Sequence, residues 1–321
     1  MCPHPVHSVA IMRIEVFQEL KMIYVIALSF HRPKFCANAT WNPNGITFAN
    51  ASTQPFGIFI DLQDVVYATE QTTNRVDIWS ENGTTPIRVL SGQINNPGAI
   101  FVSDQGDIYV DGGSTKQIVK WTPNNDTGIV VINTTTECLG LFIDVNNSLY
   151  CSGNNQPNVT KVSLNGSSYS WILVAGKNIA GPASDELNHP NGIFVTADFD
   201  LYVADCFNNR IQRFHLGQSS ATTVAGNGAA GTISLSLPTG VTLDANGYLF
   251  IADAFNHRIV GQGPYGFRCI AACSGSSGST PTTLTQSRTL AFDSHGNLYV
   301  ADTGNNRIQK FILMANSCSK C

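Results

Sequence analysis

One phrase of sequence recurs along the chain and limits its fold more than any other feature. The clearest copy begins at Pro190 with Pro-Asn-Gly-Ile-Phe-Val, continues through Leu201–Asp205 as Leu-Tyr-Val-Ala-Asp, and ends with Asn-Asn-Arg-Ile-Gln-Arg-Phe at Asn208–Phe214. Each copy carries one aromatic marker residue, found at positions 67, 109, 150, 202, 250 and 299. Similarity at a spacing of 41 to 52 residues indicates a repeat protein with six units.

Each copy predicts three β-strands, because it contains short segments rich in Ile, Val, Phe and Tyr that turn residues separate. A fourth strand is expected after each of the first five copies, at 87–90, 129–132, 171–175, 222–225 and 267–271. The sixth copy lacks one, but residues 45–49 (Gly-Ile-Thr-Phe-Ala) precede the first copy. We therefore predict an all-β fold: a six-bladed β-propeller of four-stranded blades, closed by an N-terminal strand that completes the last blade. Such closure leaves no long unpaired sheet edge.

The repeated phrase resembles the NHL repeat, whose members fold as six-bladed β-propellers. The resemblance covers roughly residues 41 to 313 and is strong in repeats four to six but degenerate in the first three. One enzymatic relative, the peptidyl-amidating lyase, has zinc-binding His close after the repeat Pro. The corresponding residues here are Phe56, Gly98, Asn191 and Thr239. None is His, so the resemblance does not supply a zinc site.

Residues 1–35 differ from the rest of the chain. Ile23–Phe30 is a largely apolar run that basic residues flank, and Ala27–Ser29 has the small residues of a signal-cleavage site. We interpret 1–35 as a leader that is a secretory signal, 36–316 as the propeller and 317–321 as a C-terminal tail. The alternative is a partly helical leader on a cytosolic protein.

Two further features favour secretion. The Asn-x-Ser/Thr sequence that accepts N-linked glycans occurs eight times, at Asn38, Asn50, Asn82, Asn125, Asn133, Asn146, Asn158 and Asn165. Nine cysteines are present, and loss of Cys2 with the leader would leave an even number. We predict three disulfides: Cys138 with Cys151 across one hairpin, Cys36 with Cys318 at the ring closure, and Cys269 with Cys273 as a local loop.

Acid–base pairs recur at a spacing of five residues. They are Asp205 with Arg210, Asp253 with Arg258, and Asp302 with Arg307, and Asp111 with Lys116 keeps the same spacing. Each pair can bridge the loop between a second and a third strand as a charge-assisted hydrogen bond. Because a catalytic group is needed only once, we interpret these repeated pairs as structural.

The remaining polar and aromatic loop residues are the candidates for ligand binding. Phe207 and Phe255 occupy matching loop positions, where exposed aromatic side chains suit recognition, although packing against the next blade is an equal alternative. With them we group the neighbouring residues His189, Asn191, Asn208, Asn256 and His257. Two histidines without a carboxylate cluster make a weak metal site, so no metal and no cofactor are expected.

Composition narrows the choice of function. Only 12% of the 321 residues are charged and the pI is about 5.9, which argues against nucleic-acid binding. No apolar run reaches the ~20 residues of a membrane span. We expect a secreted, monomeric, non-catalytic scaffold that binds an unknown protein or small ligand through the loops of one propeller face. The alternative is a metal-dependent propeller hydrolase or lyase with its site at the central channel, which inward-facing Asp, Asn, Glu or His would favour.

Overall fold

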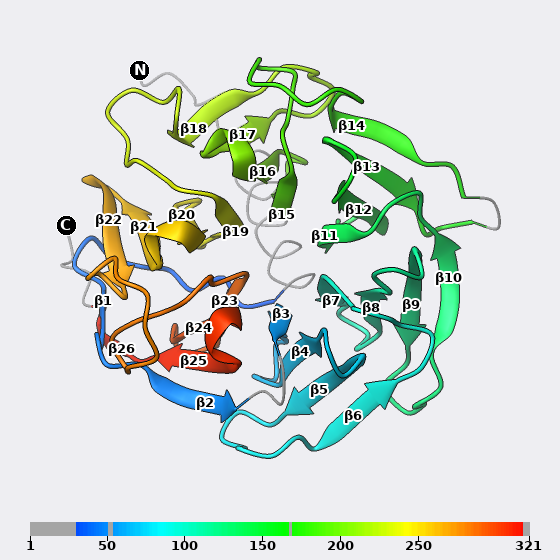
Figure 1. Ribbon diagram of the computed structural model, residues 1–321, viewed down its shortest axis with the longest axis horizontal. Helices are drawn as coiled ribbons and strands as arrows, with labels where there is room; N and C mark the ends of the chain where they lie inside the picture. The colour runs from blue at the N-terminus through cyan, green and yellow to red at the C-terminus, as the bar shows by residue number, and fades with distance from the viewer. Residues whose placement is uncertain (1–29, 51–53, 167–168, 317–321) are drawn as a thin grey trace, which may run out of the picture.

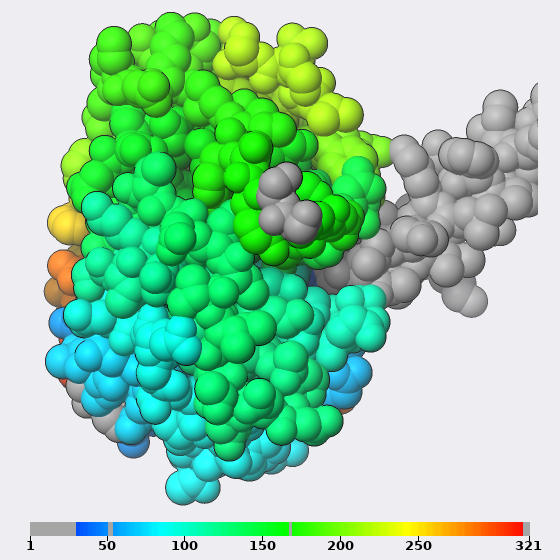
Figure 2. Space-filling view, turned by 90° about the vertical axis from the view of Figure 1, so that its right-hand side faces the viewer, coloured from blue at the N-terminus to red at the C-terminus, as the bar shows by residue number. Residues whose placement is uncertain are grey.

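Six four-stranded antiparallel sheets form a closed ring around a central axis (Figure 1). The structure is a computed structural model and describes residues 30–50, 54–166 and 169–316. Within each sheet, called a blade, the first strand lies nearest the axis and the fourth lies on the rim. In side view, blades 1 to 3 pack next to one another, coloured cyan to green (Figure 2). The predicted fold class is confirmed.

The blades follow one another along the chain. Blade 1 comprises β3 (Pro55–Ile60), β4 (Val66–Glu70), β5 (Arg75–Trp79) and β6 (Arg88–Ser91). Blade 2 comprises β7 (Ile100–Val102), β8 (Ile108–Asp111), β9 (Gln117–Trp121) and β10 (Ile129–Asn133). Blade 3 comprises β11 (Cys138–Ile143), β12 (Ser148–Gly153), β13 (Asn158–Ser163) and β14 (Ile172–Gly176).

The second half of the ring has the same order. Blade 4 comprises β15 (Pro190–Val195), β16 (Leu201–Asp205), β17 (Arg210–Phe214) and β18 (Thr222–Gly226). Blade 5 comprises β19 (Pro238–Leu243), β20 (Leu249–Asp253), β21 (Arg258–Gly263) and β22 (Gly266–Ala271). Blade 6 comprises β23 (Leu290–Phe292), β24 (Leu298–Asp302), β25 (Arg307–Phe311) and, from the start of the chain, β2 (Ile46–Asn50). Short 3₁₀ helices lie between the second and third strands of blades 4 to 6: η1 (Cys206–Asn208), η2 (Ala254–Asn256) and η3 (Thr303–Asn305).

The ring closes through β2, as the sequence predicts. This strand pairs antiparallel with β25, with Ile46 opposite Lys310 and Asn50 opposite Arg307. A second contact, absent from the sequence-based prediction, joins β1 (Thr40–Trp41) to β26 (Leu313–Ala315). Chain segments from both ends of the sequence therefore hold the last blade together.

The glycine of the Pro-x-Gly phrase has a packing role. A Cβ atom on Gly140, Gly192 or Gly240 would lie 2.5 to 2.7 Å from a backbone carbonyl oxygen of the next blade. These are the distances to Asn191, Thr239 and Arg288 respectively. Only glycine therefore allows the inner strands of adjacent blades to approach this closely around the axis.

The turns between first and second strands share one device. In four blades an Asp side chain accepts two backbone N–H groups, two and four residues further on; these are Asp61, Asp144, Asp244 and Asp293. In blades 2 and 4 the hydroxyl of Ser103 or Thr196 accepts one of these bonds. The side chain thus fixes the tight turn that the strand pair requires.

Two of the three expected disulfides join described residues: Cys138–Cys151 and Cys269–Cys273. Cys36 is also disulfide-bonded. Its expected partner, Cys318, lies outside the described residues, so that pairing stays a prediction. Among the described cysteines, Cys206 is the free thiol, and it is buried.

Packing against the propeller extends further towards the N-terminus than the boundary at residue 36 implies. Phe35 is buried, with its ring 4.9 Å from that of Trp41 and 5.0 Å from that of Phe292. Arg32 donates a hydrogen bond to the carbonyl of Asp244 in blade 5. Phe30 and Phe35 therefore pack against the propeller although both precede the boundary expected from the sequence.

Candidate functional site

The two faces of the ring differ in their connections. The loops between second and third strands and the loops between blades lie on one face, here called the upper face. The turns between first and second strands and between third and fourth strands lie on the other, the lower face. The sequence-based candidates Phe207, Asn208, Phe255, Asn256 and His257 all belong to loops of the upper face.

The repeated acid–base pairs are formed in blades 4 to 6. The distances from the arginine Nε to the carboxylate are 2.6 Å for Arg210 and Asp205, 2.8 Å for Arg258 and Asp253, and 2.7 Å for Arg307 and Asp302. The arginines also donate to carbonyls of the preceding inter-blade loop, such as those of Pro182, Ala183 and Glu186 for Arg210. Each pair thus ties the loop within a blade to the loop between blades.

Asn208 and Asn256 belong to the same structural unit. Their side-chain amides donate to Asp205 and Asp253 at 2.8 Å, and Asn208 also donates to the carbonyl of Gly181. The structure therefore uses these amide N–H groups inside the blade, although the sequence groups both residues with the ligand-binding candidates.

The expected pair of Asp111 and Lys116 is not formed among the described ion pairs, and the reason is an additional loop residue. Lys116 has φ +52° and occupies the left-handed position that Asn209 (φ +55°) occupies in blade 4. Gln117 then begins β9, where Arg210 begins β17. Asp111 is left buried without an arginine, and burial raises its pKa to about 7.

Phe207 and Phe255 are the exposed aromatic residues of the upper loops. They are 53% and 52% exposed, at equivalent positions of η1 and η2. The His189 ring stacks on that of Phe207, with the centroids 4.5 Å apart. Burial lowers the pKa of His189, and its Nδ1 lies 3.2 Å from the carbonyl oxygen of Asn154. His189 and Phe207 thus come together as one surface feature.

The other two candidates lie deeper. Asn191 is 2% exposed, and its Nδ2 atom has no acceptor among the described residues. His257 has φ +51° and takes the left-handed loop position, with its Nδ1 atom buried and likewise without a described partner. These residues are positioned by the inner strand of blade 4 and the loop of blade 5, not by one common cleft.

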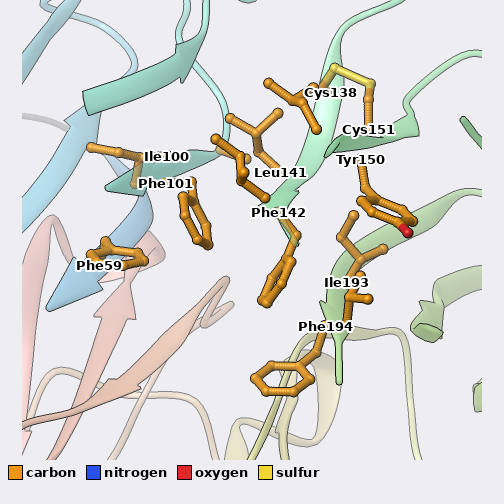
Figure 3. Close-up of a cluster of buried hydrophobic side chains, with 14 of the residues drawn as sticks. Phe59, Ile100, Phe101, Cys138, Leu141, Phe142, Tyr150, Cys151, Ile193 and Phe194 are labelled. Atoms are coloured by element: carbon orange, nitrogen blue, oxygen red, sulfur yellow. A yellow bond between two sulfur atoms is a disulfide. The ribbon is translucent and has the colours of Figure 1, made fainter. Parts of the chain in front are cut away.

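Phenylalanines line the central channel (Figure 3). Phe59, Phe101, Phe142 and Phe194 come from equivalent positions of the inner strands of blades 1 to 4. Phe30 contacts all four edge-on, with centroid distances of 5.6 to 6.3 Å. Phe30 therefore closes the channel near the lower face.

A cavity of about 100 Å³ lies in this channel. The blades line it with Phe, Ile, Leu, Val, Ala, Gly and Thr, and the titratable lining residue His31 comes from the N-terminal segment. The described lining has no carboxylate or imidazole from the blades, so these residues do not fit the metal site that the hydrolase or lyase alternative requires.

A cluster of possible metal ligands lies on the lower face instead. One ligand atom each from Asp64, Glu81 and His295 lies within 4.8 Å of the others. Asp64 is already occupied, because its carboxylate accepts from the backbone and hydroxyl of Ser294 and contacts His31 at 2.9 Å. We interpret the cluster as a hydrogen-bonded link between blades 1 and 6.

The predicted glycosylation sites differ in solvent exposure. Asn158 is 3% exposed and donates to Asn178, so its side chain cannot carry a glycan in this fold. The other seven are at least partly exposed. Asn82, Asn125 and Asn165 occupy the turns between third and fourth strands of blades 1 to 3, on the lower face.

The comparisons with known proteins agree with this architecture. The NHL repeat family model matches residues 288–311. The chain therefore carries an NHL repeat in blade 6 and folds as a six-bladed β-propeller. No curated protein matches its sequence. None of the described helices is long and apolar enough to cross a membrane.

Solved structures resemble this propeller in fold alone. A protein of unknown function from Bacteroides thetaiotaomicron is 15% identical with a TM-score of 0.68, covering 89% of this chain and 76% of that one. An auxiliary nutrient binding protein from Bacteroides ovatus is 13% identical with a TM-score of 0.64, covering 90% and 76%. Virginiamycin B lyase from Staphylococcus aureus is 14% identical with a TM-score of 0.58, covering 84% and 98%.

Two important residues escape sequence reasoning: Phe30, which belongs to the expected leader, and Arg288. Arg288 stands where other repeats have the middle residue of Pro-x-Gly, in the sequence Ser-Arg-Thr. This departure from the repeat is the signal that could have drawn attention to it.

Proposed function

We propose that this NHL-repeat propeller is a secreted, glycosylated monomer that binds a protein or small ligand through its upper face and has no catalytic activity of its own. The observation that carries the proposal is the pair of half-exposed phenylalanines, Phe207 and Phe255, on adjacent blades. Large aromatic side chains on rigid loops supply most of the binding energy in many interfaces.

The loops beneath these phenylalanines are held rigidly. Asp205 and Asp253 each bind an arginine and an asparagine of their own loop and a backbone N–H of the inter-blade loop. A side chain on such a support loses little backbone entropy when a partner binds, which favours affinity.

The distribution of glycosylation sequences supports the same face. Asn50 and Asn133 end rim strands of blades 6 and 2 at the upper face, and Asn82, Asn125 and Asn165 lie on the lower face. None of the eight sequences belongs to blade 4 or 5, so glycans would leave Phe207 and Phe255 accessible. The disulfides Cys138–Cys151 and Cys269–Cys273 support secretion, because such bonds persist in oxidising compartments.

The test compares protein capture by wild-type propeller, by the double variant Phe207→Ala/Phe255→Ala, and by Tyr265→Ala. Tyr265 is the matched control, because it is 92% exposed but lies in the turn between β21 and β22 on the lower face. Each protein is immobilised and incubated with an extracellular extract, and captured proteins are quantified by mass spectrometry.

We expect the double variant to fold normally, with an unchanged melting temperature. The amount of protein that it captures specifically should be at least tenfold lower than the amount that the wild type captures. Tyr265→Ala should capture as the wild type does. Equal capture by the wild type and the double variant would contradict the proposal that Phe207 and Phe255 form the binding surface.

A further inference from the structure

Six residues surround the upper end of the channel at equivalent positions. Each lies three residues before the inner-strand residue that pairs with the aromatic marker, as Phe56 does before Phe59, which pairs with Tyr67. In chain order they are Phe56, Gly98, Leu139, Asn191, Thr239 and Arg288, here called the mouth ring.

Arg288 is the charged member of the mouth ring, and its guanidinium has no hydrogen-bond acceptor or carboxylate partner among the described residues. Every other described arginine has one, as Arg213 has with Asp200 at 2.6 Å. The Arg288 Cζ atom lies 4.9 Å from the ring centroid of Phe56, in a cation–π contact. Burial lowers its pKa, and no described carboxylate opposes that effect.

The guanidinium lies across the mouth of the channel. Arg288 belongs to blade 6 and contacts Phe56 of blade 1. Burial lowers the pKa of His189 and raises that of Cys206, and the Arg288 charge acts on both groups. Both adjoin or belong to blade 4, opposite blade 1 in the ring. Because burial holds the Cys206 pKa at about 12, the thiol is neutral and cannot serve as the counter-ion.

Below the mouth ring lies the apolar cavity of about 100 Å³, whose lining includes Leu139 of the mouth ring, Thr289 next to Arg288, and Phe30. Because an apolar cavity of ~150 Å³ takes up a whole benzene molecule, this smaller cavity has room for most of a phenyl ring whose substituted end stays at the mouth. The site thus combines an unpaired cation at its entrance with a small apolar space beneath. The amide of Asn191, on the mouth ring, adds a buried donor without an acceptor.

We propose that the channel mouth binds a small monocarboxylate, with the carboxylate on the Arg288 guanidinium and a compact apolar body in the cavity. A guanidinium presents a planar fork of donors that matches a carboxylate in two parallel hydrogen bonds. Arg288 is partly buried, and a partly buried charge without a partner is costly; a bound carboxylate lowers that cost. The inference rests on the proposed function only in that both place binding on the upper face.

Isothermal titration calorimetry of the full protein with four probes tests the site. Benzoate carries both a carboxylate and an apolar body; benzamide keeps the body without the charge; acetate keeps the carboxylate without the body; inorganic phosphate is a different anion. Variants are Arg288→Gln, Arg288→Lys and, as a matched control on the lower rim, Arg88→Ala, whose arginine pairs with Asp126.

We expect benzoate to bind the wild type at least tenfold more tightly than each of the other three probes. Arg288→Gln should weaken benzoate binding at least tenfold, and Arg288→Lys should weaken it less, because lysine keeps the charge but loses the fork. Arg88→Ala should bind as the wild type does. Melting temperatures identify any variant that fails to fold. If Arg288→Gln does not fold, benzoate binding by Arg288→Lys is compared with that of the wild type instead.

Three results would overturn the proposal: no benzoate binding to the wild type, equal binding of benzamide, or equal binding of phosphate. The two proposals can fail separately. Phe207→Ala/Phe255→Ala should leave benzoate binding unchanged. Protein capture that is equal in this variant and the wild type would contradict only the proposed function, whatever the result with benzoate. Unchanged benzoate binding by Arg288→Gln would contradict only the proposed carboxylate site at the channel mouth.

Discussion

Asp111 makes the stability of this propeller depend on pH in a direction opposite to that of most carboxylates. Its side chain is 1% exposed and accepts a hydrogen bond from the backbone of Gly113 at 3.0 Å. Because no arginine reaches it, burial raises its pKa from 3.8 to about 7. The native state therefore holds a proton that the unfolded chain has already released at pH 5.

The magnitude follows from linkage. Below pH 3.8 the carboxyl is protonated in both states and its full stabilisation is present; as the pH rises to about 7, this stabilisation is lost. At 1.36 kcal/mol for each pH unit, the free energy of unfolding should fall by about 4 kcal/mol over that range and by about 3 kcal/mol between pH 5 and pH 8. Asp111→Asn keeps an acceptor for Gly113 but cannot ionise, so it should remove this fall.

The assay is urea unfolding of wild type and Asp111→Asn at pH 5 and pH 8, followed by tryptophan fluorescence. The quantity of interest is the difference between the two proteins in their change with pH, because other titrating groups cancel in it. Asp302→Asn is the comparison at pH 8, where it leaves Arg307 without its carboxylate and should cost about 3–5 kcal/mol. An identical fall in stability for wild type and Asp111→Asn would refute the assignment.

Two further predictions concern the ring itself. Arg307→Ala should lower the melting temperature more than Arg258→Ala, because the Arg307 side chain is 9% exposed and binds three inter-blade carbonyls, whereas that of Arg258 is 22% exposed and binds one. The expected losses are about 3–5 and about 1–2 kcal/mol, and equal losses by calorimetry would contradict the role given to the carbonyls. Deletion of residues 36–50 should expose the edge of blade 6 and cause aggregation or a large fall in melting temperature; a truncated protein that melts like the full one would contradict closure by β2.

Sequence reasoning reaches the ring, the strand order, its closure by β2 and the acid–base pairs, because each depends on a pattern that repeats. It fails where a single copy departs from the pattern. The loop before Gln117 is one residue longer than its counterpart in blade 4, so Lys116 takes the left-handed loop position and does not pair with Asp111. The spacing of five residues between Asp111 and Lys116 in the sequence does not reveal this difference. Burial is the second limit: Asn158 has the sequence of a glycan acceptor, but its place on β13 hides it. Spacing in the sequence carries no information on either effect.

Closure by the first long strand sets the time at which this protein can finish folding. Thr47 in β2 hydrogen-bonds Gln309 in β25, 262 residues further along the chain. At a synthesis rate of ~5–20 residues per second, β2 waits roughly 13 to 50 seconds for its partner to leave the ribosome. Throughout that interval the five earlier blades can form locally, while β2 remains an unpaired strand that is able to pair with another nascent chain. During synthesis β2 is therefore exposed to pairing with the wrong partner for longer than the strands of blades 1 to 5, whose partners follow within the same blade.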